Sequence, residues 1–128
     1  MAAGFRDLKV YQLAYRTAME IFLESKKFPV EERYSLIDQI RRSSRSVCSN
    51  TAEGYRKKRY PVMFVSKIAD ADGEAAETQV HLDLTKDCGY LSEDKHAYYI
   101  AHYEEIGRML GSMSNHPEKF KFDRPAEQ

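Results

Sequence analysis

Apolar residues recur at intervals of three and four along most of the chain, which is the spacing of one face of an α-helix. They form four segments, at about 7–27, 31–55, 61–88 and 93–114. With 6 glycines and 4 prolines, the chain has too few turn residues for an all-β domain. The pattern predicts an all-α fold, an antiparallel up-down-up-down four-helix bundle over residues 1–117. Residues 118–128 are polar and predict a flexible C-terminal tail, which Phe120 and Phe122 could pin to the bundle.

The ends of these segments carry residues that start and stop helices. Asp7 and Ser92 are expected to cap the first and fourth helices, because their side-chain oxygens can accept from unpaired N–H groups. Pro61 suits the first turn of the third helix. Pro29 ends the first, since the residue before a proline is pushed out of the α region.

The first and third segments each predict a definite apolar face. In the first, the face is expected to consist of Leu8, Tyr11, Tyr15, Ala18 and Phe22. The third carries one stripe of Phe64, Ile68, Ala71, Ala75, Thr78 and Leu82, and a second stripe of Val62, Val65, Ala69, Ala76 and Val80. A helix that is apolar on two sides needs two partners, within the monomer or in an oligomer.

Export and membrane insertion are not indicated. No run approaches the roughly 20 apolar residues of a membrane-spanning helix, and no export signal begins the chain. We therefore expect a cytoplasmic protein without a membrane partner. Its two cysteines, Cys48 and Cys88, are far apart and are expected to be free thiols, with Cys48 in the core.

Charge is balanced over the whole chain but strongly polarised within it, with 20 Lys and Arg against 20 Asp and Glu. A basic stretch contains only one acid, Glu53, and consists of Arg41, Arg42, Arg45, Arg56, Lys57, Lys58 and Arg59. An acidic stretch without any base follows, with Asp70, Asp72, Glu74 and Glu77.

Two interpretations of this polarisation remain open. The seven basic side chains, with Tyr55 and Tyr60 on either side of the last four, could bind nucleic acid, because cations pair with phosphates and bases stack on tyrosine. Alternatively, the charges form structural ion pairs between neighbouring helices. The residues of that second reading are Arg41, Arg42, Glu53, Asp70, Asp72, Glu74 and Glu77.

No arrangement of residues indicates an enzyme, a metal site or a cofactor. The acidic stretch contains no Glu-x-x-His, the motif of di-iron bundles. No two histidines are four residues apart, as the zinc proteases require. We therefore expect no catalytic residue, no metal ligand and no cofactor.

The second segment carries a long motif, which runs Gln39-Ile40-Arg41-Arg42-Ser43-Ser44-Arg45-Ser46-Val47, then Asn50, then Ala52-Glu53-Gly54-Tyr55-Arg56. It resembles the signature of a family of four-helix bundle proteins encoded in intervening sequences of bacterial 23S ribosomal RNA genes. Further similar motifs are Phe5-Arg6-Asp7-Leu8-Lys9-Val10, Gly89-Tyr90-Leu91 and Pro117-Glu118-Lys119-Phe120.

The resemblance implies a ring-like homopentamer without known enzymatic activity. A related branch, the accessory protein of diversity-generating retroelements, binds nucleic acid and a reverse transcriptase through basic outer surfaces. We therefore expect a homo-oligomeric scaffold that binds RNA, DNA or a ribonucleoprotein, with a reverse transcriptase or ribosomal component as the kind of protein partner. The alternative is a protein-interaction module whose charge clusters lock the oligomer, without nucleic-acid binding.

Overall fold

The computed structural model describes residues 4–120, which form four long α-helices and no β-strand. The long helices are α1 (Lys9–Ser25), α2 (Asp38–Arg56), α3 (Pro61–Asp87) and α4 (Glu93–Asn115). Short 3₁₀ turns are η1 (Phe5–Asp7), η2 (Val30–Glu32) and η4 (Pro117–Phe120), and η3 (Arg33–Ile37) is a π turn. The predicted all-α class and the four helices are confirmed.

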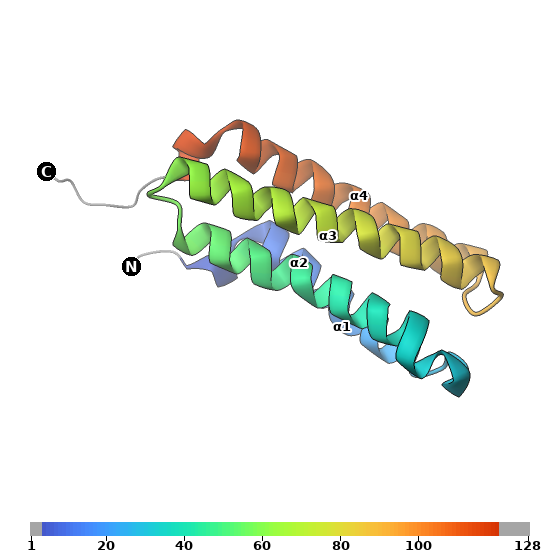
Figure 1. The fold of residues 1–128 in the computed structure, drawn as a ribbon. Coiled ribbons are helices and arrows are strands. Elements are labelled where there is room, and N and C mark those ends of the chain that lie inside the picture. The colour runs from blue at the N-terminus through green and yellow to red at the C-terminus, as the bar shows by residue number, and fades with distance from the viewer. Residues whose placement is uncertain (1–3, 121–128) are drawn as a thin grey trace, which may run out of the picture.

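The four helices lie side by side, and successive helices run in opposite directions (Figure 1). α2 packs between α1 and α3, and α4 packs on α3 and α1. The α2–α3 connection lies at the same end as the start of α1 and the end of α4, whereas the α1–α2 and α3–α4 connections lie at the opposite end (Figure 1). This arrangement is consistent with a four-helix bundle.

One stripe of α3 is buried, as the periodicity predicts. Its members are Phe64, Ile68, Ala71, Ala75, Thr78, Leu82 and Thr85. The second predicted stripe faces outward along most of its length, and Val62 and Val80 are 84% and 54% exposed. The partner that this second stripe needs is therefore not within the described part of the chain.

On α1 the predicted apolar face is wrong. The buried residues are Val10, Ala14, Thr17, Ile21 and Ser25. Tyr15 is 54% exposed, and Tyr11 and Phe22 are half-buried at the edge of the core. Two apolar stripes lie next to each other on this helix, and the inward one contains the smaller residues Ala14 and Thr17.

The helix ends agree with the sequence in three places and differ in two. Ser92 accepts a hydrogen bond from the Lys95 amide (3.1 Å), Pro61 opens α3, and α1 ends before Pro29. Asp7 does not cap α1, because it belongs to η1 and its carboxylate accepts from the Gly4 amide (3.0 Å).

The second helix begins later than predicted. In place of regular helix from Glu31, the chain forms η2 and η3 before α2. Glu32 ties this segment to the other connection at the same end, since its carboxylate accepts from Ser35 (2.6 Å) and from the Tyr90 hydroxyl (2.9 Å). Leu36 and Ile37 are both buried in the π turn. These tertiary contacts override the helical pattern of the sequence.

Part of the predicted tail is packed on the bundle. Phe120, in η4, stacks on the buried ring of Phe64, with centroids 5.7 Å apart. Phe122 and the rest of the tail fall in 121–128, outside the described residues. The domain boundary at residue 117 stays a prediction. None of the helices in 4–120 combines the length and apolarity needed to cross a membrane.

Candidate nucleic-acid interface

The seven predicted basic residues fall into two groups at different heights of α2. Arg41, Arg42 and Arg45 lie in its first half, whereas Arg56 ends it and Lys57 begins the connection to α3. Arg45 and Arg56 are separated by about 16 Å along the helix axis, at 1.5 Å per residue. Each group therefore has its own surroundings.

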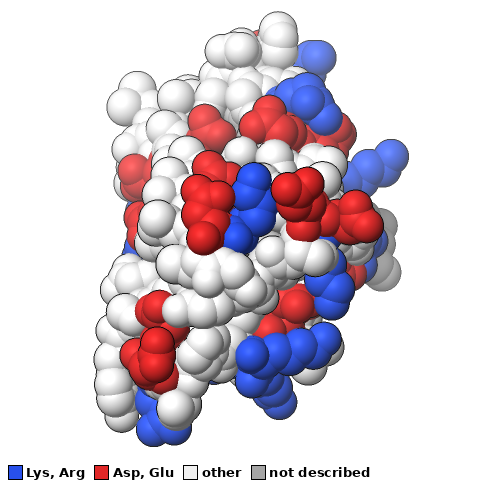
Figure 2. Space-filling view, turned by 90° about the vertical axis from the view of Figure 1, so that its right-hand side faces the viewer, with Lys and Arg blue, Asp and Glu red and all other residues white. Residues whose placement is uncertain are grey.

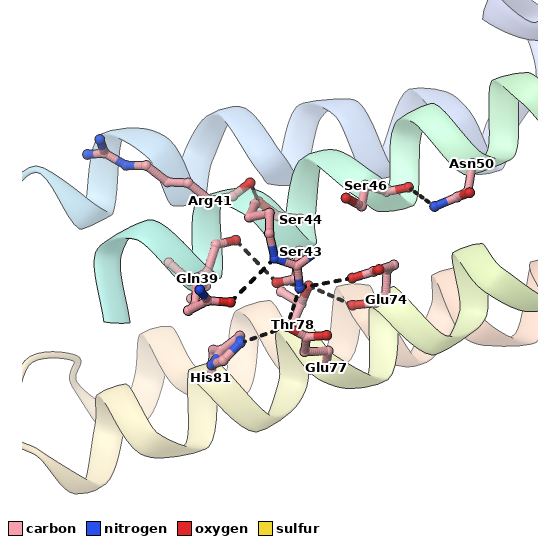
Figure 3. A network of polar contacts seen from close by, with 12 residues as sticks. Gln39, Arg41, Ser43, Ser44, Ser46, Asn50, Glu74, Glu77, Thr78 and His81 are labelled. Carbon is pink, nitrogen blue, oxygen red and sulfur yellow. Dashed lines mark hydrogen bonds and ion pairs between the residues drawn. The ribbon is translucent and has the colours of Figure 1, made fainter. Parts of the chain in front are cut away.

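Arg42 forms an ion-pair cluster with α3 (Figure 3). Its guanidinium lies 3.4 Å from Glu74 and donates a hydrogen bond to Glu77, whose carboxylate also lies 3.2 Å from Nε2 of His81. Hydrogen bonding from Arg42 holds the pKa of the Glu77 carboxyl below its usual range. The pairs join α2 and α3 of one chain, so Arg42 is already engaged within the protomer.

Arg41 does not pair with the acids of α3, which corrects its assignment to the ion pairs. Figure 3 shows Arg41 extending away from α3. Its Nε donates to the Ser25 hydroxyl (2.7 Å), and its guanidinium lies 4.7 Å from the centroid of the Phe22 ring. Because successive helical residues differ by about 100°, Arg41 faces α1 where Arg42 faces α3. The half-buried guanidinium has fewer donors left for a phosphate.

The remaining acids of the predicted ion pairs behave differently. Glu53 pairs with Lys67 (2.7 Å), whose hydrogen bond lowers the pKa of the Glu53 carboxyl. Within residues 4–120, no ion pair joins Asp70 or Asp72 to a basic side chain. Both carboxylates are exposed on α3.

α2 and α3 pack closely together along their length, up to the basic connection that joins them. Ser43 and Thr78 are buried and share a hydrogen bond of 2.8 Å between their hydroxyls. Near the end of α2, a Cβ on Gly54 would lie 2.9 Å from Cδ1 of Ile68. Only a glycine leaves room for α3 at this point, and α2 ends two residues later, at Arg56.

The α2–α3 connection presents its charges at one end of the bundle. The Lys57 amide bonds to the Gly54 carbonyl (2.9 Å) and the Tyr60 amide to the Lys57 carbonyl (2.8 Å), which makes the turn tight. Arg56 and Arg59 are exposed, and Tyr60 is 53% exposed.

Tyr55, by contrast, cannot offer its ring to a base, so its assignment as a stacking residue is wrong. It is buried, because it lies one helical turn after the buried Thr51. The ammonium of Lys58 lies 3.7 Å from the centroid of its ring.

The α2–α3 connection and the start of α3 are basic. Residues 54–69 contain five basic residues and no acid. Figure 2 shows the opposite end, where Lys and Arg are interspersed with Asp and Glu. The N-terminus of α3 opens beside the basic residues without a side-chain cap. Its unpaired N–H groups and helix dipole favour an anion there.

Sequence reasoning missed a groove between α1 and α2. It has a volume of about 380 Å³ and is lined on the α1 side by Tyr11, Tyr15, Met19 and Phe22. Its position could not be derived from the sequence, because the apolar spacing assigns most of the same aromatic residues to the core.

No metal centre is assembled among the residues that the structure describes. These residues contain no group of three or more His, Cys, Asp or Glu side chains placed to hold a metal ion. Cys48 and Cys88 are both free thiols, and burial raises the pKa of Cys48 to about 11. The thiol of Cys48 is therefore buried, and it is protonated at neutral pH.

Comparison with known proteins matches the sequence to one family model and the fold to a solved structure. The family model described as 23S rRNA-intervening sequence protein matches residues 6–112. The crystal structure of a protein of unknown function from the S23 ribosomal protein family of Bacteroides thetaiotaomicron VPI-5482 is similar, with a TM-score of 0.74 and 24% sequence identity. The match covers 82% of this chain and 97% of that one. None of the curated proteins compared with the chain matches it.

Proposed function

The chain belongs to the 23S rRNA-intervening sequence protein family, and from that premise we propose that it is a non-enzymatic, homo-oligomeric scaffold that binds RNA or a ribonucleoprotein. The observation that carries the proposal is the basic α2–α3 connection, Arg56 to Arg59, displayed beside Tyr60 at one end of the bundle. A fold does not fix a function, so this surface, and not the bundle itself, supports RNA binding.

Charge is the first support for RNA as the ligand. The connection concentrates cations in a stretch without acids, and exposed Arg56 and Arg59 can each pair with a phosphate. Arg45 is also exposed on α2, about 16 Å from Arg56 along the helix axis, and offers a further cation. Arg42 contributes less, because Glu74 and Glu77 already neutralise it.

Geometry is the second support. The half-exposed ring of Tyr60 stands at the N-cap of α3, where it can stack on a base while the first N–H groups of the helix face a phosphate. Together these groups suit backbone binding with little sequence preference.

Assembly is supported by the outward stripe of α3. Val62 and Val80 are exposed at its ends, and the exposed Ala69 and Ala76 between them are small enough for a neighbouring helix to approach closely. Several exposed apolar side chains along one stripe of a helix are typical of an interface. In this proposal the stripe packs against a neighbouring copy in a ring-like homopentamer. Arg42 makes its ion pairs with Glu74 and Glu77 of the same protomer, which argues against its locking copies together.

The proposal places the protein in the cytoplasm, where a reverse transcriptase or a ribosomal component is the kind of protein partner that the bound ribonucleoprotein would bring.

Titration of a labelled, structured RNA at several salt concentrations tests RNA binding. Replacing all four connection cations with serine should weaken binding and reduce the slope of log K against log salt by up to about 4, roughly 1 for each phosphate that a cation no longer neutralises. A control variant removes four cations elsewhere, at Arg16, Lys27, Lys86 and Arg108, and should change the slope little. Equal slopes in the two variants would contradict the proposed surface.

A further inference from the structure

The groove between α1 and α2 has an aromatic wall that is partly exposed to solvent. Tyr15 and Met19 are 54% and 46% exposed along it. The rings of Tyr11 and Tyr15 lie 5.9 Å apart, and Phe5 meets Tyr11 edge-on at 5.1 Å. Phe5 of η1 and Tyr11 and Tyr15 of α1 thus form a row of rings, which is half-buried at Phe5 and Tyr11 and exposed at Tyr15.

Small residues of α2 make the groove hollow. Cys48, Ser49 and Ala52 face the aromatic row, and none of them is long enough to fill the space. The resulting volume, about 380 Å³, lies within the usual range of small-molecule sites.

Cations gather over the rings at both ends of the groove. At one end, the Phe22 ring has Lys26, Arg41 and Arg45 at 4.8, 4.7 and 5.7 Å from its centroid. At the other end, Arg6 and Arg56 lie 4.5 and 5.8 Å from the centroid of Phe5. Among the described residues that line the groove there is no carboxylate.

We propose that this groove binds unpaired bases of a single-stranded nucleic acid, with Tyr15 as a stacking platform and Arg45 and Arg56 on the flanking phosphates. The inference rests on the proposed function and names the part of the RNA that the protein recognises. Aromatic rings beside a positively charged track are the usual features of single-strand binding. Arg45 and Arg56 are about 16 Å apart along the axis of α2, a length that suits a few nucleotides of a single strand.

Charge complementarity selects this occupant. An apolar peptide would fill the aromatic wall but leave the flanking guanidinium groups without an anion. A regular duplex would satisfy the cations, yet its stacked bases could not enter the groove. A strand with unpaired bases satisfies both the rings and the cations.

The test is a titration of the full-length chain with three RNAs. One is a single strand that contains 2-aminopurine, whose fluorescence is quenched on stacking; the second is the same strand with abasic sites; the third is a duplex. The variant combines Tyr15→Ser and Met19→Ser, both at exposed side chains, and the control is Tyr98→Ser at an exposed tyrosine of α4.

We expect the double variant to bind the base-bearing strand about 10-fold more weakly and to lose the quenching, while its affinity for the abasic strand and the duplex is unchanged. The Tyr98 variant should behave as the wild type.

Equal wild-type affinity for the base-bearing and abasic strands would overturn the groove proposal, while salt-dependent binding that disappears in the connection variant would leave the proposed function standing. Failure of the wild type to bind any of the RNAs would overturn both. If the double variant changes the mass of the particle in light scattering, the groove is an interface between copies and the proposal is wrong.

Discussion

Replacing Gly54 with alanine should destabilise the protein, although alanine is the better helix former. The gain in helix propensity is about 1 kcal/mol. Against it, the new Cβ would lie 2.9 Å from Cδ1 and 3.3 Å from Cγ1 of Ile68, and 3.2 Å from Cβ of Lys67. Ordinary contacts begin near 3.4 Å, and Ile68 is fully buried, so it has little freedom to turn away. Such overpacking costs about 1–3 kcal/mol.

Gly111→Ala provides the matched control. Gly111 lies inside α4, and a Cβ there would meet nothing within 4 Å. The propensity gain is similar in both variants and cancels in their difference, which should therefore be about 1–3 kcal/mol. Urea unfolding followed by helical circular dichroism, at one protein concentration, measures it. Equal stabilisation of both variants would refute the close approach of α2 and α3 at Gly54.

Further predictions concern the ion-pair cluster and the thiols. Because Arg42 lowers the folded-state pKa of Glu77, the stability from this exposed pair is present above the ordinary carboxyl pKa of 4.5 and is lost as the pH falls through the lowered value. Arg42→Met should therefore be less stable than the wild type by up to about 1 kcal/mol at pH 7, and the two should converge in acid unfolding curves; a gap that persists would argue against the pair. At pH 8 a thiol reagent should modify exposed Cys88 quickly and buried Cys48, whose pKa is about 11, only on unfolding. Mass spectrometry measures the rate of modification at each site, and equal rates would contradict the burial of Cys48.

Long regular segments were predictable from the sequence. The buried stripe of α3 and its start at Pro61 follow from spacing and proline chemistry, because every residue from Phe64 to Leu82 in the stripe repeats one helical period. The N-cap at Ser92 is likewise a local effect. Apolar spacing and capping residues are enough to predict a helix where only one of its faces can pack on the core.

Predictions failed where two faces of a helix compete. On α1, the helical spacing assigned Tyr15 and Phe22 to the core, yet the face with the smaller residues Ala14 and Thr17 lies inward. The groove lies along the aromatic residues that this packing leaves outside the core.

The candidate site shows the same limit. Arg41 and Arg42 are neighbours in sequence but point to different helices, and Tyr55 falls on the buried stripe of α2. Charge counts along the chain cannot resolve such differences, because they depend on which helix lies beside each face.

The proposed function is that of a scaffold that assembles and binds RNA. Size-exclusion chromatography with light scattering tests both properties directly, by measuring the mass of the particle at low salt with and without structured RNA. We predict a mass of about five protomers that increases when RNA is added. Ala76→Asp, on the outward stripe of α3, should dissociate the particle, whereas Ala101→Asp, at an exposed position of α4, should leave it intact. A wild-type monomer that elutes unchanged with RNA would contradict both the assembly and the binding.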